Sequence, residues 1–307
     1  MVLNLAVHLA LLIGVPPLLP GVINKTKAWV AGRDGPPLLQ TYHDVWKLFQ
    51  KGAVYSQTAT WIFRAGPIVS LAAVLCAGLV LPLASNASPL GFAGDVIAFA
   101  YLLGLGRFFT MAAALDTGSS FEGMGASREA AFSAFAEPAL FLSLAIVCVP
   151  AGSASFGEAF GTLPWATWGV SHPTFLAAAL SLFAVLLAEN SRIPVDDPNT
   201  HLELTMVHEV MVLDHGGPDF AFVLYGSAVK LFAIGALLVH VLLPIPADGG
   251  WRGVLLLLGG EIALAAAVGV VESVMARQRL ARVPQFLVGA AVLAAIGLAA
   301  LFYRGAP

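Results

Sequence analysis

The stretch AENSRIPVDDPNTHLELTMVHE, residues 188–209, concentrates ionisable side chains in an otherwise apolar chain. It holds five carboxylates, two histidines and one arginine, whereas only 11% of the whole chain is charged. Histidines and carboxylates at close spacing can bind a metal ion or exchange protons. Their spacing therefore has to be compared with what each chemistry requires.

The spacing of the histidines argues against a metal site. His201 and His208 are seven residues apart, which is about 10.5 Å along a helix and too far for one shared ion. His208 and Glu209 are followed by Val-Met-Val, so the zinc-protease pattern H-E-x-x-H is not met. We expect no metal here. We expect instead a polar lining that is reached by water or by a partner protein.

The prolines of this stretch set its local structure. Pro194 and Pro198 stop a helix and force the chain to turn. Thr200 is a suitable N-cap for a helix that restarts there, and Glu203 completes a capping box three positions later. Glu203 therefore has a structural role available to it as well as a chemical one.

Other ionisable side chains interrupt long apolar runs. They are Arg107, Lys230 and Glu261 inside such runs, and Asp95, Asp116, Glu137, Glu189 and Glu272 near the ends of such runs. A charge in the middle of a membrane costs about 2.5–3.5 kcal/mol on insertion scales, so these groups should face the interior of a bundle. Two interpretations stay open. The charges form static ion pairs, for example between Lys230 and a neighbouring acid, or they form a proton relay with water between its members.

The composition requires a membrane-embedded helical bundle to position these residues. The chain has 307 residues, of which 59% are hydrophobic, and its charged fraction is less than half of the ~25% typical of soluble domains. We expect an all-α polytopic membrane protein that forms a single integral membrane domain over residues 1–307. About eight segments approach the ~20 residues that a span needs. They are Val2–Leu19, Ile62–Leu83, Phe92–Leu115, Ala134–Val149, Pro173–Ala188, Phe220–Leu243, Gly253–Val271 and Gln285–Tyr303.

Net charge and cysteine usage exclude two classes of site. The net charge is −3, so no basic surface for nucleic acid is indicated. Cys76 and Cys148 lie in separate apolar runs without a C-x-x-C motif. We therefore expect no iron–sulfur cluster and no structural zinc in this chain. If the protein serves electron transfer, other subunits hold the electron carriers.

The distribution of Lys and Arg predicts the orientation in the membrane. Eleven of these residues fall in the loops after the first, third, fifth and seventh apolar segments, and only Arg252 and Arg304 fall on the other side. The first group should be cytoplasmic, which places both termini on the non-cytoplasmic side. Two long cytoplasmic loops follow from this orientation, at residues 22–61 and at the acid-rich residues 189–219.

The first of these loops contains an amphipathic helix. Leu38, Tyr42, Val45 and Phe49 recur at the spacing of one helical face. One interpretation is an interfacial helix that lies among the lipid headgroups. The other is a helix that lines an entrance between the membrane and a docked partner, and the two are compatible.

Three stretches carry a resemblance to a known family. They are TKAWVAGRDGPPLLQTYHDVWKLF (26–49), GMGASREAAFSAFAEPAL (123–140) and ENSRIPVDDPNTHLELTMVHEVMVLDHGG (189–217). Together with the order of the spans, they resemble the subunit 1 or H-type membrane subunit of respiratory complex I. Within that superfamily the chain looks closer to the membrane subunit of formate hydrogenlyase, hydrogenase-4 and related membrane-bound nickel–iron hydrogenases than to the complex I branch.

Short motifs favour the hydrogenase branch of this superfamily. That branch typically reads S-S-R-E and T-H-L-E-L-T-M-x-H-E, close to Ser127–Glu129 and Thr200–Glu209 here. The complex I branch typically reads R-A-P-F-D, E-S-E-L and E-Y-S-G. This chain has Arg192–Asp196, His201–Leu204 and Asp214–Gly217 in those places. These departures weigh against quinone binding.

The resemblance implies a subunit in the inner membrane of a prokaryote, surrounded by lipid, that docks a cytoplasmic arm. Its implied partners are an iron–sulfur small subunit, a nickel–iron-type large subunit and antiporter-like membrane subunits. The iron–sulfur clusters and the nickel–iron centre belong to those partners. In quinone-reducing relatives the amphipathic helix frames a quinone cavity, for which Trp46 and Phe49 are the candidates here. The motif match carries over a charged junction at Glu137, Glu189, Arg192, Asp196, Glu203, Glu209 and Asp214.

These expectations lead to one preferred function and two alternatives. The preferred function is a non-redox membrane subunit that anchors the hydrophilic arm and supplies a charged, proton-conducting path at the junction. The first alternative is a quinone-binding H-type subunit of an NADH:quinone-type complex. The second is an autonomous secondary transporter, against which the lack of a visible internal repeat and of broken mid-span helices argues.

Overall fold

The computed structural model describes residues 2–162, 173–196, 207–247 and 249–303, and these residues form helices, turns and loops without any strand. The α-helices are α1 (Val2–Gly14), α2 (Leu18–Val30), α3 (Gln40–Phe49), α4 (Trp61–Val80), α5 (Asp95–Asp116), α6 (Ser120–Cys148), α7 (Phe156–Gly161), α8 (Pro173–Glu189), α9 (Gly217–Leu242), α10 (Trp251–Val274) and α11 (Val283–Tyr303). Short 3-10 turns are η1 (Val149–Ala151), η3 (Glu209–Val212) and η4 (Leu280–Arg282).

The protein is an all-helical polytopic membrane protein, as the composition predicts. Six of the described helices, α4, α5, α6, α9, α10 and α11, are long and apolar enough to cross a membrane. The bent pair α1 and α2 makes a seventh if it counts as one span, and α8 is a shorter apolar helix of 17 residues. The expected fourth segment, Ala134–Val149, is too short, because α6 begins at Ser120. The first turns of α6 are helical but polar, so hydropathy alone does not detect them.

The first expected span is a broken helix, so the expectation that no span is broken is wrong. The described pair α1 and α2 bends by 46° at a break that contains two consecutive prolines, which cannot continue the hydrogen-bond ladder. Two backbone carbonyls near the break find side-chain donors instead. The Tyr225 hydroxyl donates to the Ile13 carbonyl at 2.8 Å, and the Tyr42 hydroxyl donates to the Gly14 carbonyl. Backbone freed inside a membrane needs such partners, because lipid offers none.

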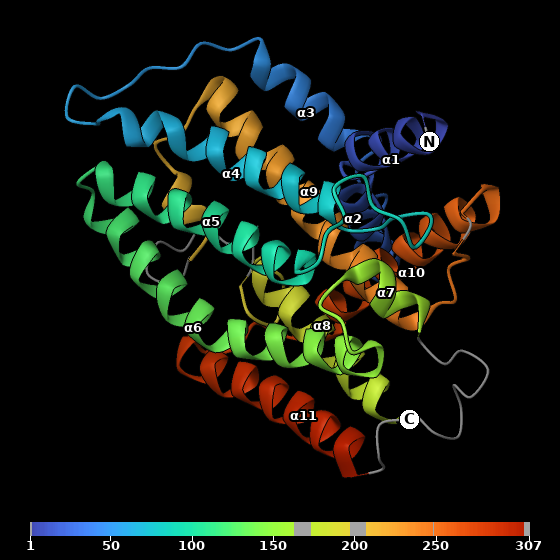
Figure 1. The fold of residues 1–307 in the computed structure, drawn as a ribbon. Helices are drawn as coiled ribbons and strands as arrows, with labels where there is room; N and C mark the ends of the chain where they lie inside the picture. The colour runs from blue at the N-terminus through green and yellow to red at the C-terminus, as the bar shows by residue number, and fades with distance from the viewer. Residues whose placement is uncertain (1, 163–172, 197–206, 248, 304–307) are drawn as a thin grey trace.

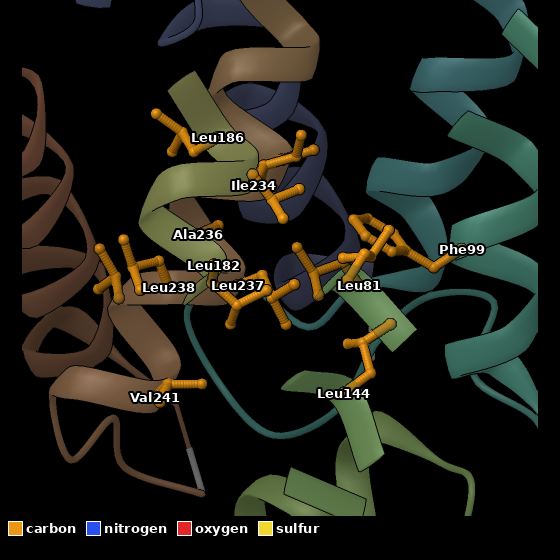
Figure 2. Packing of buried hydrophobic residues seen from close by; sticks show 14 of the residues in the cluster. Leu81, Phe99, Leu144, Leu182, Leu186, Ile234, Ala236, Leu237, Leu238 and Val241 are labelled. Carbon is orange, nitrogen blue, oxygen red and sulfur yellow. The ribbon is translucent and has the colours of Figure 1, made fainter. Parts of the chain in front are cut away.

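The helices pack around α9. In Figure 1, α4 and α5 run side by side, and α6 lies along α11. Of the residues in the most apolar stretch of α9, 67% are buried. In the most apolar stretch of the segment that includes α11, only 22% are buried. Helix α9 is therefore central and α11 is peripheral. Figure 2 shows side chains of α8 and α9, among them Leu182, Leu186, Ile234 and Leu237, meeting in the apolar core. This core holds α8 and α9 in register, which places the charged residues of both helices.

The amphipathic helix α3 packs on the bundle through part of its apolar face. The Phe49 ring lies 5.5 Å from the Phe222 ring of α9 in an edge-to-face arrangement. Trp46 is 69% exposed. The interfacial and entrance-lining roles of this helix both stay predictions.

Candidate functional site

Arg107 forms the centre of a charged cluster inside the bundle. This side chain lies in the middle of α5 and is buried. Its guanidinium donates to Glu189 of α8 at 2.7 Å and to Glu137 of α6 at 3.0 Å. One cation therefore joins carboxylates from two other helices. Such sharing stabilises a buried arginine, because fork-like donors can satisfy two acceptors at once.

Lys230 of α9 extends this cluster to a fourth helix. Its ammonium lies 3.7 Å from the second carboxylate oxygen of Glu189, and its side chain is 13% exposed. That distance makes an ion pair but is longer than a hydrogen bond. Four side chains named from the sequence, Arg107, Glu137, Glu189 and Lys230, are thus brought together from α5, α6, α8 and α9.

A small polar cavity lies against this cluster. It has a volume of about 40 Å³, and its lining includes Arg107, Glu129, His208 and Lys230. The hydroxyl-bearing residues Ser70, Thr110 and Ser227 also line it. A cavity of this size and polarity can hold a few water molecules, since one water needs roughly 10–15 Å³. Of the acids of the cluster, Glu129 lines this cavity together with His208.

Glu129 and His208 were not among the residues predicted for the junction. The fourth apolar segment is expected to begin only at residue 134, so Glu129 lies before it. The extended α6 instead carries Glu129 into the bundle. The signal available in the sequence was its spacing from Glu137, eight residues away, which places both acids on similar faces of one helix.

The segment that bears His208 is held against α6 by a glycine. A Cβ atom on Gly125 would come within 2.3 Å of a Val210 side-chain methyl, so no larger residue fits without a shift of the segment. Burial of the imidazole, together with the Lys230 ammonium, lowers the pKa of His208 to about 4. His208 is therefore neutral near pH 7 and can both accept and donate a hydrogen bond.

Asp196 fixes the other side of the same segment. Its carboxylate pairs with Arg277 at 2.7 Å and accepts hydrogen bonds from the backbone N–H groups of Val207 and His208, each at 3.3 Å. Asp196 is buried, as a carboxylate with these partners can be. These contacts are structural, and they position His208. Glu203 lies outside the described residues.

A separate ion-pair group ties the first helix pair to α10. The Glu272 carboxylate is fully buried and lies 2.8 Å from the Lys27 ammonium and 3.4 Å from the Arg192 guanidinium. Lys27 was expected in a loop, but α2 continues through it. Arg192 lies in the turn after α8. This group holds α2, α10 and the start of the acid-rich loop together.

The remaining predicted residues lie elsewhere. Asp95 is buried and accepts hydrogen bonds from the Phe156 N–H at 2.8 Å and the Ser155 hydroxyl at 3.2 Å, which anchors the start of α7. Glu261 is buried and packs against Gly235, and one of its oxygens has no hydrogen-bond partner among the described residues. Asp214 is exposed, and Glu209 is half-buried in η3.

The geometry permits two kinds of chemistry. The alternating acids and bases can hold helices together as static ion pairs. They are also compatible with proton transfer, because the Glu129 carboxylate, the His208 imidazole and three hydroxyl-bearing residues line a cavity large enough for water. Among the residues that the structure describes, no group of three or more His, Cys, Asp or Glu side chains could hold a metal ion.

Comparisons with known proteins agree on one family. A family model described as NADH dehydrogenase matches residues 3–303. Formate hydrogenlyase subunit 4 of Escherichia coli (strain K12) is 31% identical over 264 residues, which cover 86% of this chain and 83% of that protein. Hydrogenase-4 component C of the same organism is 34% identical over 234 residues, which cover 76% and 73%.

A solved structure shares the fold. It is that of the membrane-bound sulfane sulfur reductase, described as an archaeal respiratory membrane complex. The matching chain has a TM-score of 0.83 at 24% sequence identity, with 96% of this chain and 97% of that chain covered. At this level of identity the likeness concerns the fold alone.

Proposed function

Because the chain belongs to the NADH dehydrogenase family, in the superfamily of complex I subunit 1 and H-type membrane subunits, we propose that it is a non-redox membrane subunit of a nickel–iron-hydrogenase-type, formate-hydrogenlyase-like complex. The names of the two curated relatives, a hydrogenlyase subunit and a hydrogenase component, support this branch. The observation that carries the proposed mechanism is the charged cluster around Arg107, Glu189 and Lys230.

The proposed contribution of this chain is a proton path. Burying Arg107, Glu189 and Lys230 in the bundle is costly, and replacing buried ion pairs by apolar residues is often neutral or stabilising. Static pairing alone gives no reason for a hydroxyl-lined cavity beside the pairs. A path that passes protons among Glu137, Glu189, Glu129 and His208 accounts for both the charges and the cavity.

The proposed anchor for the hydrophilic arm is the end of the bundle where α4 begins and α9 begins. Apolar side chains of loops at this end are exposed, with Val54 at 93% and Leu213 at 55%. Asp196 with Arg277 and Glu272 with Arg192 make the neighbouring turns rigid. A rigid surface with exposed apolar side chains outside the spans is suited to a docked protein. The proposed partners there are the iron–sulfur small subunit and the nickel–iron-type large subunit.

Purification of the intact assembly tests this function. A tagged copy of the chain would be extracted from its native membrane in mild detergent, and the copurifying subunits would be identified by mass spectrometry. A large subunit that keeps four nickel-ligating cysteines, together with hydrogen evolution, is the expected result. A large subunit without those cysteines, together with quinone reduction, would favour the quinone-binding alternative. A chain that purifies alone would favour a transporter.

A further inference from the structure

A wide apolar groove runs along the outward face of α5. Its volume is about 1160 Å³, and α4 borders it through Cys76 and Val80. The α5 side chains that line it are exposed, with Tyr101 at 69%, Phe108 at 59% and Leu105 at 43%. In a membrane this surface faces lipid or another protein.

One residue that lines the groove carries a carboxylate, which is rare on a lipid-facing surface. Glu137 of α6 lines this groove, lies within the span Ser120–Ala151, and has a side chain that is 48% exposed. Its only hydrogen bond or ion pair within the described residues is to Arg107, which also serves Glu189. A half-exposed carboxylate within a membrane span is costly unless something in contact with it supplies a donor or an opposite charge.

The formal charge of the cluster indicates which sign of charge a partner in the groove would have to carry. Glu129, Glu137 and Glu189 contribute three carboxylates, whereas Arg107 and Lys230 contribute two cations. The formal balance is one excess negative charge beside the groove. A basic side chain would complement it.

Neither lipid nor a second copy of the chain can supply this basic side chain. Acyl chains carry no hydrogen-bond donor. Arg107 and Lys230, the two cations near the middle of a described span, have side chains only 7% and 13% exposed, so a second copy has neither of them free to reach Glu137.

We infer that the groove on α5 receives a transmembrane helix of a different membrane subunit, and that this helix presents a basic side chain to Glu137. The inference rests on the proposed function only in that the chain assembles with other membrane subunits. It does not depend on hydrogenase chemistry or on a proton path. The apolar length of the groove supplies packing, and the Glu137 contact fixes the depth and register of the incoming helix.

Site-specific photo-crosslinking in the intact complex tests the inference. A benzophenone amino acid would replace Leu105 in the groove and, as the control, Ile296 on α11, which is 62% exposed. Position 105 is expected to capture one partner subunit, in a transmembrane segment with a Lys, Arg or His within two turns of the captured residue. Lipid adducts alone, capture of a second copy, a segment without a basic residue, or equal capture of the same segment from position 296 would overturn it.

Variants of Glu137 test the charge contact itself. Glu137→Leu should lower capture at position 105 severalfold, whereas Glu137→Gln, which keeps an acceptor, should lower it less. If Glu137→Leu prevents assembly, substitution of the partner's basic residue by Ala in a Glu137→Gln background serves instead and should lower capture further. Unchanged capture in these variants contradicts the proposed contact. A chain that purifies without partners counts against the proposed function, whereas a complete complex that captures only lipid counts against this inference alone.

Discussion

The carboxylates of the bundle differ in what they contact, and this separates structural from chemical candidates. Asp116 accepts hydrogen bonds from the Thr60 N–H and hydroxyl at 2.6 and 2.8 Å, and so holds the start of α4. Asp95 does the same for α7. Glu189, by contrast, contacts two cations and lies among side chains that border a polar cavity. Only the second kind of environment favours proton exchange.

The first prediction compares two buried acids. In the assembled complex, Glu189→Gln should reduce proton movement in inverted membrane vesicles by roughly a hundredfold, the size expected when a proton-transfer group is lost. Glu261→Gln is the matched control, because Glu261 is equally buried but has no ion pair within the described residues. Its variant should change proton movement little. Equal effects of the two substitutions would show that Glu189 has only a structural role.

The second prediction concerns the pH dependence of stability. The pKa of His208 is lowered to about 4 in the folded chain by burial and by Lys230, whereas an exposed histidine titrates near ~6.5. Between these values the unfolded chain binds a proton that the folded chain does not, so stability falls as the pH drops from about 6.5 to about 4. Below the lower value no further loss from this group is expected.

Thermal denaturation in detergent measures this effect. Over that pH window the melting temperature of the His208→Gln variant should fall less than that of the wild type. The same substitution at the exposed His43 should leave this fall in melting temperature unchanged. Burial also lowers the pKa of His215, so part of the loss should persist in the His208 variant. An identical pH profile in the variant and the wild type would contradict the assignment.

At the level of helices, the break between α1 and α2 couples three elements. Tyr225 of α9 and Tyr42 of α3 both donate to carbonyls next to the break. The orientation of the first span therefore depends on helices that are distant in sequence. Gly125 acts similarly where α6 meets η3, because the absence of a side chain permits the close approach that places His208.

The third prediction removes one tyrosine donor, the Tyr225 hydroxyl. Tyr225→Phe should destabilise the chain by about 1 kcal/mol, the usual net value of one hydrogen bond, or more because the carbonyl is left without a partner. Tyr303→Phe is the control, since Tyr303 is 94% exposed. The midpoint of thermal unfolding in detergent measures both. A Tyr225 variant as stable as the control would mean that water or lipid headgroups satisfy the carbonyl.

At the scale of the whole molecule, the asymmetry of basic residues is the main topological signal. Arg128, Arg192 and Arg277 belong to the loops that were predicted to be cytoplasmic, and Arg252 begins α10 at the opposite end. Two of these cations form ion pairs: Arg192 pairs with Glu272, and Arg277 pairs with Asp196. The loops that should face the cytoplasm are thus also tied to one another.

The fourth prediction tests this orientation. A reporter that is active only in the periplasm should be active when fused after Pro307 and inactive when inserted after Gly118, in the loop between α5 and α6. A cytoplasm-specific reporter should give the opposite pattern. Cytoplasmic activity at the C-terminus would mean that one apolar helix does not cross the membrane, and the 17-residue α8 is the first to examine.

Composition and local pattern alone determined the class of this protein and most of its helices. A chain that is 59% hydrophobic and 11% charged can satisfy its backbone in lipid only as helices or as a closed barrel. The amphipathic spacing around Tyr42 likewise predicted α3. These features depend on short-range periodicity, and periodicity is present in the sequence itself.

The site could be predicted only in part, because its pairings are long-range. The cost of burying Arg107, Lys230 and Glu189 shows that each needs a polar environment, but not which partners supply it. Only the packing of α5, α6, α8 and α9 decided that Arg107 joins two carboxylates. The helical position of Glu129 was missed because the first turns of α6 are polar. Hydropathy detects helices that face lipid, not polar helical turns that pack against other helices.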